Sequence, residues 1–162
     1  MSDSYTINDL DLGENQEQDD TAKDLYLCFE VDGADYVIEV GSIKEIIVMC
    51  DITPVPGAPA YVKGIINLRG DISPVLSLRL RLMKPEKEYD SLSCIVVLDI
   101  DDQIIGLIVD SVTGTMHISG ESIVPSPSKR SEYSEQFVTN VCKTDDGLKL
   151  LLDINKLLFG QV

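Results

Sequence analysis

The chain has 162 residues, of which 44% are hydrophobic and 25% are charged. These values are typical of a globular protein with one domain, or two small subdomains that share a core. The formal net charge of -15 argues against a nucleic-acid partner and against direct insertion at an anionic membrane surface, because both would repel the chain. No apolar run approaches the roughly 20 residues that cross a bilayer, and no signal peptide is present. We therefore expect a cytoplasmic protein.

The N-terminal segment is strongly acidic. Residues 1–23 contain seven Asp and Glu residues against one base, Lys23. Low hydrophobicity combined with high charge predicts a disordered tail. The four cysteines are scattered without any C-x-x-C spacing, so we expect reduced, packing cysteines and no zinc or dithiol site: Cys28, Cys50, Cys94 and Cys142.

Strand patterns begin at residue 24. Residues 25–31 alternate between apolar and other side chains, which predicts a half-buried strand, and Asp32-Gly33 provides a turn into a second strand at residues 36–40. Ser42 and Glu45 have the spacing of a helical capping box, although the β-branched residues that follow also favour a strand over residues 46–49. The sequence leaves the helical turn and the strand both open.

The central part of the chain combines prolines with apolar strands. Pro54, Pro56 and Pro59 predict an extended loop. Residues 63–68 and 71–76 are strand-like and meet at Arg69-Gly70, whereas residues 78–82 fit either a strand or a short helix. Five bases lie within residues 69–87, which predicts a mixed solvated face, with steering of an acidic partner as the alternative: Arg69, Arg79, Arg81, Lys84 and Lys87.

The polar residues 84–90 read as a connector between two halves of the domain. Residues 92–100 and 104–109 predict a hairpin buried on both faces, in which Gly106 marks a bulge or a close backbone approach. A strand at 112–118, a hairpin over 137–154 and a helical turn at 155–159 complete about ten short strands. The sequence therefore predicts an all-β barrel or sandwich with short helical turns.

The chain offers little for catalysis. Its one histidine, His117, is expected on an exposed strand face without the nucleophile and orienting group that catalysis needs. No nucleophile elbow or phosphate loop occurs, and Asp99, Asp101 and Asp102 fit a solvated hairpin turn better than a calcium loop. We therefore expect no enzyme activity, no catalytic residue, no cofactor and no metal.

Arg69 is the polar residue that most suggests binding. It lies beside a glycine between two apolar strands, and arginine is enriched at protein interfaces because it stacks and forms bidentate hydrogen bonds. Glu45 interrupts another apolar segment and is a plausible partner for the guanidinium. The alternative is a surface turn with a solvent-screened ion pair that contributes little. The residues alone do not decide between these two readings.

Several segments resemble the CheW-like proteins, the chemotaxis coupling-protein family. Residues 59–70, Pro-Ala-Tyr-Val-Lys-Gly-Ile-Ile-Asn-Leu-Arg-Gly, closely match the family pattern P-x-[FY]-[IV]-x-G-[VI]-x-N-L-R-G. Residues 25–29, 43–46, 105–110 and 152–158 also resemble family elements, so the resemblance covers residues 24–160. Ser77 departs from the pattern, since the family commonly has Asp before Leu-Arg.

The resemblance implies two five-stranded SH3-like β-barrels within a CheW-like domain of residues 24–162, with about residues 24–84 mostly in the first barrel and about residues 90–160 mostly in the second. It implies a non-enzymatic adaptor that couples transmembrane chemoreceptors to a CheA-type histidine kinase in bacterial chemotaxis. The expected partners are the kinase regulatory domain and the cytoplasmic signalling tip of the receptors, which family members bind near the groove between the barrels. The protein would be recruited to membrane-associated receptor arrays. The alternative is an adaptor of another receptor–kinase system, such as pilus-based motility.

The resemblance also implies two sets of binding residues. The receptor-facing set contains Ile43, Glu45, Gly64, Asn67, Leu68, Arg69 and Gly70. The kinase-binding set contains Ser93, Cys94, Ile95, Val96 and Gly106.

Overall fold

The computed structural model describes residues 4–6, 23–126 and 136–160. Most of the predicted disordered tail therefore lies outside the described residues, as does most of the loop expected at residues 125–135. Within the tail, Ser4–Thr6 form a strand, β1, which pairs antiparallel with β4 (Ile43–Val48) and places Thr6 opposite Glu45.

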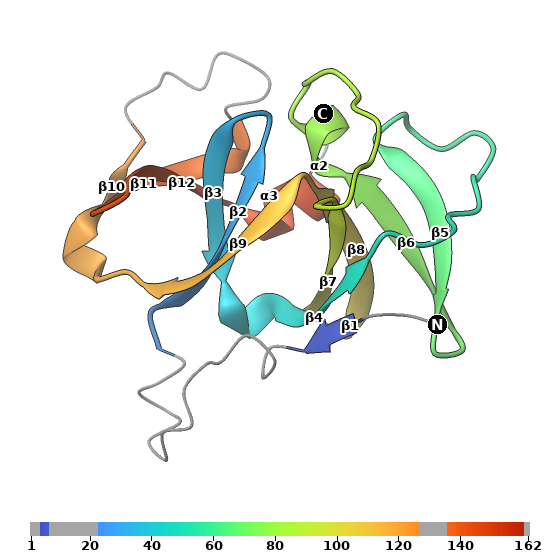
Figure 1. The fold of residues 1–162 in the computed structure, drawn as a ribbon, viewed down its shortest axis with the longest axis horizontal. Coiled ribbons are helices and arrows are strands. Elements are labelled where there is room, and N and C mark those ends of the chain that lie inside the picture. Colours follow the sequence, from blue (N-terminus) through green and yellow to red (C-terminus); the bar gives the residue numbers. More distant parts are fainter. Residues whose placement is uncertain (1–3, 7–22, 127–135, 161–162) are drawn as a thin grey trace.

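The predicted all-β class is confirmed, with two six-stranded sheets side by side (Figure 1). Sheet A has the strand order β1, β4, β7 (Cys94–Ile100), β8 (Gln103–Val109), β6 (Asp71–Ser77) and β5 (Val62–Leu68). Sheet B has the order β10 (Ile123–Pro125), β11 (Val138–Thr144), β12 (Gly147–Leu152), β3 (Ala34–Glu39), β2 (Leu25–Val31) and β9 (Ser111–His117). Each sheet has five longer strands, the predicted number, and one strand of three residues.

Each sheet takes most of its strands from one half of the chain and the rest from the other half. The strands β2 and β3 belong to sheet B with the C-terminal strands, whereas β7 and β8 belong to sheet A with β4, β5 and β6. Two parallel pairings join strands that are distant in sequence, β3 with β12 and β6 with β8. Local patterns reveal hairpins but not which hairpins share a sheet, so the exchange of β2–β3 and β7–β8 between the halves could not be read from the sequence.

Three apolar clusters explain how the two sheets hold together. The shared core joins one face of each sheet and includes Leu27, Phe29 and Ile38 of sheet B with Leu76, Val96, Leu98 and Leu107 of sheet A. The opposite faces bury their own clusters. The sheet A cluster contains Ile47, Ile66, Val75, Ile95, Val97 and Ile108, and the sheet B cluster contains Tyr26, Cys28, Val37, Ile118 and Cys142. The two sheets therefore form one folding unit.

Burial on both faces corrects one prediction and confirms another. The strand β2 was predicted to be half-buried, but Leu27 and Phe29 face the shared core while Tyr26 and Cys28 face the sheet B cluster. Alternation of apolar residues with Tyr and Cys therefore does not mark a solvent face here, because both of these side chains pack well in cores. The β7–β8 hairpin is buried on both faces, as predicted.

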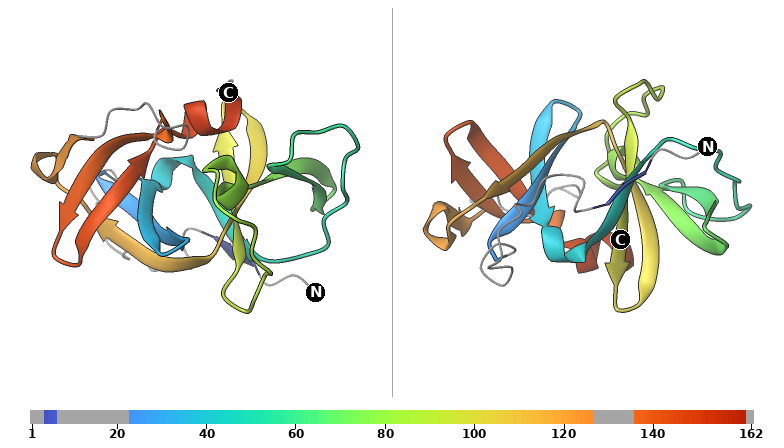
Figure 2. Two further views of the ribbon diagram at one scale, coloured as in Figure 1. Left: turned by 90° about the horizontal axis from the view of Figure 1, so that it is seen from above. Right: turned by 60° about the horizontal axis from the view of Figure 1, so that its bottom comes forward.

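The short helices settle the open alternatives. Residues Leu78–Arg81 form a helix, α2, and the Ser77 hydroxyl accepts a hydrogen bond from the Leu80 N–H at 3.2 Å, so serine performs the capping role available to aspartate. A 3-10 helix at Val40–Ser42 leads directly into β4, which decides that segment in favour of a strand. The last helix, α3, spans Ile154–Phe159. Both α2 and α3 lie near the junction of the sheets (Figure 2).

The close packing of β8 requires Gly106. A Cβ atom built on this residue would lie 2.8 Å from the Cγ2 atom of Ile95 and 3.3 Å from that of Val75. The β7–β8 register is regular through this point, so the glycine marks a close approach rather than a bulge.

The cysteines predict a simple reactivity pattern. Cys50 is exposed, Cys28 and Cys142 are buried, and burial raises the pKa of both Cys28 and Cys94 to about 11. We expect a thiol reagent to modify one cysteine rapidly in the native protein and all four after denaturation, because the thiolate is the reactive form. The rapid phase should disappear in Cys50→Ser. Rapid modification of a second native thiol would show that a described cysteine is less protected than its burial indicates.

Candidate partner-binding surface

Sheet A closes on itself at the segment that follows β4. Thr53 forms an isolated bridge with Ile65 of β5, in which each backbone N–H donates to the other residue's carbonyl at 2.9 Å. Gly64 makes this approach possible, since its φ is +148° and a Cβ atom there would lie 2.1 Å from the Thr53 carbonyl oxygen. The closure joins the edge strand β5 to the continuation of β4 and covers the sheet A cluster.

The β5–β6 hairpin ends in a two-residue turn that presents Arg69. Both central residues have positive φ, +54° at Arg69 and +91° at Gly70, which is the pattern of a type I′ turn. The Asn67 side-chain oxygen accepts a hydrogen bond from the Gly70 N–H at 2.9 Å and fixes the turn from inside. Arg69 therefore projects from a defined backbone rather than from a mobile loop.

Glu45 holds the guanidinium of Arg69. The Arg69 Nη2 donates to Glu45 Oε1 at 2.8 Å, and Nη1 donates to Oε2, so the pair is bidentate. The Glu45 side chain is 2% exposed and that of Arg69 is 58% exposed. The hydrogen bonds that Arg69 donates to Glu45 raise the pKa of Arg69. The Glu45 carboxylate is buried and accepts two hydrogen bonds from one guanidinium. The pair is therefore not a solvent-screened surface ion pair.

A local irregularity in β4 places the Glu45 carboxylate. The pairing of β4 with β7 shifts register between Ile43 and Glu45, so Lys44 is left over and exposed. Ile43 belongs to the shared core and is 7% exposed. The Ile43 side chain packs between the sheets and supports β4, and its place in the receptor-binding set stays a prediction.

The other predicted receptor-facing residues divide into two groups. Asn67, Arg69 and Gly70 are exposed at the hairpin tip, and Leu68 is half-buried against the sheet A cluster. Gly64 is buried at the barrel closure, where its lack of a side chain is what matters. The structure thus brings Glu45, Asn67, Arg69 and Gly70 together and separates Gly64 from them.

The predicted kinase-facing residues lie in the interior. β7 and β8 are central strands of sheet A, so Ile95 and Val96 are fully buried on opposite faces and Gly106 is enclosed by Ile95 and Val75. Cys94 is partly buried, and the 7% exposed Ser93 donates its hydroxyl to Asp90. The part of these residues in kinase binding stays a prediction.

An open hollow of about 630 Å³ lies along the barrel closure. It is lined by Met49, Cys50, Asp51, Ile52, Pro54, Ala60, Val62, Lys63 and Tyr89. The hollow joins the proline segment to the connector that carries Tyr89. It extends the concave and partly apolar surface on this side of sheet A.

The described residues show no arrangement for catalysis or metal binding. Residues 4–6, 23–126 and 136–160 contain no group of three His, Cys, Asp or Glu side chains placed to hold a metal. His117 is exposed at the end of β9. In the same part of the chain, no helix is long and apolar enough to span a membrane.

Sequence reasoning missed the structural importance of two arginines in α2. Arg81 was expected in a mixed solvated face but is 1% exposed, and Arg79 is bonded to Asp110. The alternation Leu-Arg-Leu-Arg, directly after an apolar strand, was the available signal. A short helix at the junction of two sheets buries such arginines from both sides, which the linear pattern does not reveal.

The fold and this surface define a protein built from two packed β-sheets that presents an exposed arginine on a fixed hairpin tip. Residues 25–160 match the family described as the CheW-like domain. The chain therefore belongs to the CheW-like family, as the resemblance predicted. This family consists of scaffolding and adaptor proteins rather than enzymes, which confirms the prediction of a non-enzymatic adaptor.

Individual relatives agree with this assignment. The chemotaxis protein CheW of Thermotoga maritima is 32% identical over 132 residues, which cover 82% of this chain and 85% of the relative. That of Bacillus subtilis is 31% identical over 132 residues, with the same coverage. The crystal structure of the scaffolding protein TtCheW from Thermoanaerobacter tengcongensis superposes with a TM-score of 0.77 at 30% identity, covering 85% of this chain and 95% of that one.

The closure of sheet A predicts an unusual sensitivity at Gly64. Gly64→Ala would place a methyl group against the Thr53 carbonyl, so we expect it to lower the free energy of unfolding by at least about 2 kcal/mol in urea denaturation. Gly41→Ala is the matched control, because a Cβ atom there meets nothing within 4 Å and its φ is unstrained. Equal stabilities for the two variants would contradict the assigned role of Gly64.

Proposed function

We propose that this protein couples transmembrane chemoreceptors to a CheA-type histidine kinase in bacterial chemotaxis. Membership of the CheW-like family supports the proposal, as do relatives that carry the name chemotaxis protein CheW. The protein would act in the cytoplasm, at membrane-associated receptor arrays. It would bind the cytoplasmic signalling tip of the receptors and the regulatory domain of the kinase at the same time.

The observation that carries the proposal is the Glu45–Arg69 pair. An arginine side chain normally loses considerable rotamer freedom when it binds a partner. Here Glu45 and the I′ turn fix the side chain beforehand, while 58% of its surface remains open to solvent. Binding at this position therefore costs less conformational entropy, and the fixed guanidinium sets the orientation of a helical partner.

The hairpin tip forms the centre of the proposed receptor contact. Asn67, Leu68, Arg69 and Gly70 would contact the receptor directly, whereas Ile43 and Gly64 would support the contact from within the barrel. In the proposed kinase contact, the interior residues of β7 and β8 support the surface and do not touch the partner. This division separates residues whose substitution changes binding from residues whose substitution changes folding.

Loss of Arg69 should uncouple receptor control of the kinase. We expect Arg69→Ala and Arg69→Glu to abolish receptor-dependent kinase activation in a reconstituted assay while binding to the kinase regulatory domain persists. Lys44→Ala is the matched control, because it removes an exposed base from the neighbouring strand residue and should leave coupling intact. Normal coupling by Arg69→Glu would show that Arg69 is not part of the receptor contact.

The same pair predicts a specific stability pattern. Arg69→Ala leaves the buried Glu45 carboxylate without its bidentate donor, so the free energy of unfolding should fall by roughly 1–3 kcal/mol. Adding Glu45→Gln removes the orphaned charge and should recover part of this loss in urea denaturation. If the double variant is instead less stable by the full sum of both single changes, the two side chains are energetically independent and the assigned pair is wrong.

A further inference from the structure

The chain passes from one sheet to the other through very short connections. The 3-10 helix Val40–Ser42 joins β3 of sheet B to β4 of sheet A. At the second crossing, Asp110 is the only residue between β8 of sheet A and β9 of sheet B. The path is visible in Figure 1, where β8 continues into β9 across the junction of the sheets. Asp110 therefore occupies the position of a hinge.

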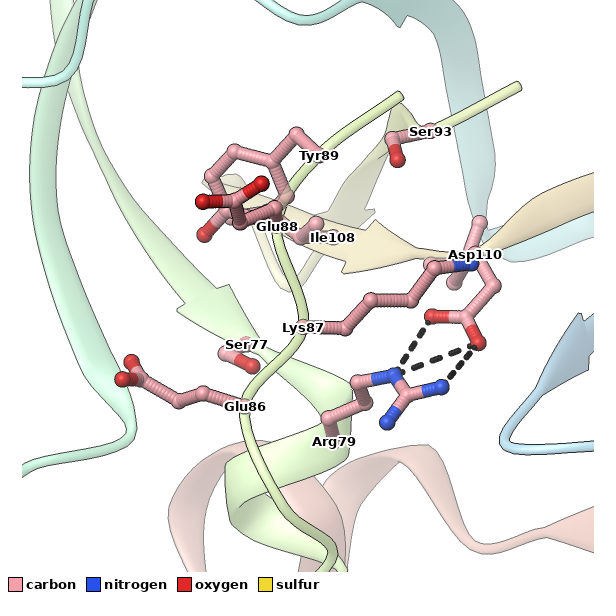
Figure 3. Close-up of a pocket in the computed structure, with 10 residues that line it drawn as sticks. Ser77, Arg79, Glu86, Lys87, Glu88, Tyr89, Ser93, Ile108 and Asp110 are labelled. Atoms are coloured by element: carbon pink, nitrogen blue, oxygen red, sulfur yellow. Dashed lines mark hydrogen bonds and ion pairs between the residues drawn. The ribbon is translucent and has the colours of Figure 1, made fainter. Parts of the chain in front are cut away.

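Arg79 of α2 grips this hinge residue. Its Nε donates to Asp110 Oδ1 at 2.9 Å and its Nη2 donates to Oδ2 at 2.8 Å, and Figure 3 shows the two side chains pointing toward each other. The backbone N–H of Asp32, in the β2–β3 turn of sheet B, donates to Asp110 Oδ2 at 2.9 Å. Arg79 Nη1 also donates to the Pro85 carbonyl at 2.9 Å. The guanidinium of Arg79 thus links helix α2 to Pro85 in the connector and to Asp110 at the crossing between the sheets.

The Asp110 carboxylate remains ionised in this setting. Burial raises the pKa of Asp110, but hydrogen bonds from Arg79 and from the Asp32 N–H outweigh that effect, and the net change is downward. The side chains of Arg79 and Asp110 are 15% and 14% exposed. Water therefore competes little for a contact between two full charges, which makes it strong and directional.

Arg81 supplies a second tie from the same helix. Its guanidinium lies between two rings, 4.3 Å from the centroid of Tyr61, which precedes β5 in sheet A, and 4.7 Å from that of Phe137, which precedes β11 in sheet B. It donates to the carbonyls of Leu157 and Gly160 at 2.7 Å each, at the C-terminal end of α3. No described carboxylate forms an ion pair with it. The two aromatic faces and the carbonyls at the end of α3 therefore stabilise the buried positive charge of Arg81.

These contacts provide what the shared core lacks. Apolar burial is non-directional, so the core resists separation of the sheets more than it resists a change in their angle. Bidentate hydrogen bonds and stacked guanidinium planes have narrow geometry. Both arginines project from the four-residue helix α2, which directly follows strand β6 of sheet A. Their contacts therefore fix the orientation of sheet B relative to this one helix.

We propose that Arg79 and Arg81 lock the angle between sheet A and sheet B and act as positioning residues for a partner that contacts both sheets. The second part rests on the proposed function, since a receptor tip bound near the junction of the sheets would sense their angle. The first part concerns the free protein and stands independently. The two parts are tested by separate measurements.

The angle is tested by residual dipolar couplings of backbone amides in weakly aligned protein. One alignment tensor should fit sheets A and B together in the unmodified protein. In Arg79→Ala and Asp110→Asn the two sheets should require different tensors, with each sheet still fitting its own structure. Arg81→Lys, which keeps the charge but loses the planar fork, should behave similarly. Lys44→Ala removes an exposed base away from this site and is the control. A common tensor in all three variants would overturn the lock.

The positioning role is tested by the affinity for a receptor signalling fragment, measured by calorimetry. We expect Arg79→Ala and Arg81→Lys to weaken binding by roughly 5-fold or more, with Lys44→Ala unchanged. If the variants change the alignment of the sheets but bind the receptor fragment with unchanged affinity, the positioning role is overturned. The proposal that the two arginines lock the sheet angle would then still stand. If the unmodified protein binds no receptor fragment, the proposed function fails and the positioning role with it, whereas the alignment data still decide the lock.

Discussion

The closure of sheet A on itself is the constraint on which the rest of the structure depends. The bridge between Thr53 and Ile65 joins the segment after β4 to β5, and the Glu45–Arg69 pair joins β4 to the β5–β6 turn. Together these contacts enclose the sheet A cluster and fix the hairpin tip. Without them β5 would be a bare edge strand, exposed to pairing with other chains. The closure of the barrel and the position of the hairpin tip are thus fixed by neighbouring contacts on the same strands.

Apolar and charged contacts have different tasks in this protein. The shared core and the two separate clusters bury both faces of each sheet and supply cohesion. A few arginines make contacts with narrow geometry: Arg69 at the hairpin tip, and Arg79 and Arg81 at the junction of the sheets. An adaptor that transmits a signal without chemistry has only its geometry to work with, so fixed orientations matter more than high stability. This division accounts for buried charges in a chain that has enough apolar residues to fold without them.

Much of this could be predicted from the sequence, and the failures share one cause. Period-2 patterns and turn residues located most strands, and the Arg69-Gly70 step between two apolar runs identified the hairpin tip. The sequence could not show that β7 and β8 join β4, β5 and β6, because sheet membership depends on contacts between distant segments. For the same reason it missed the burial of Arg81. The local pattern fixes how a strand alternates but not what covers each face.

The most direct test of the central claim is calorimetric binding of this protein to the regulatory domain of a CheA-type kinase from the same cell, with and without a receptor signalling fragment. The account predicts saturable binding to the kinase domain, a ternary complex with the receptor fragment, and receptor-dependent control of kinase activity. Absence of binding to every such kinase in that cell would contradict the coupling function, while leaving the CheW-like fold and family membership intact.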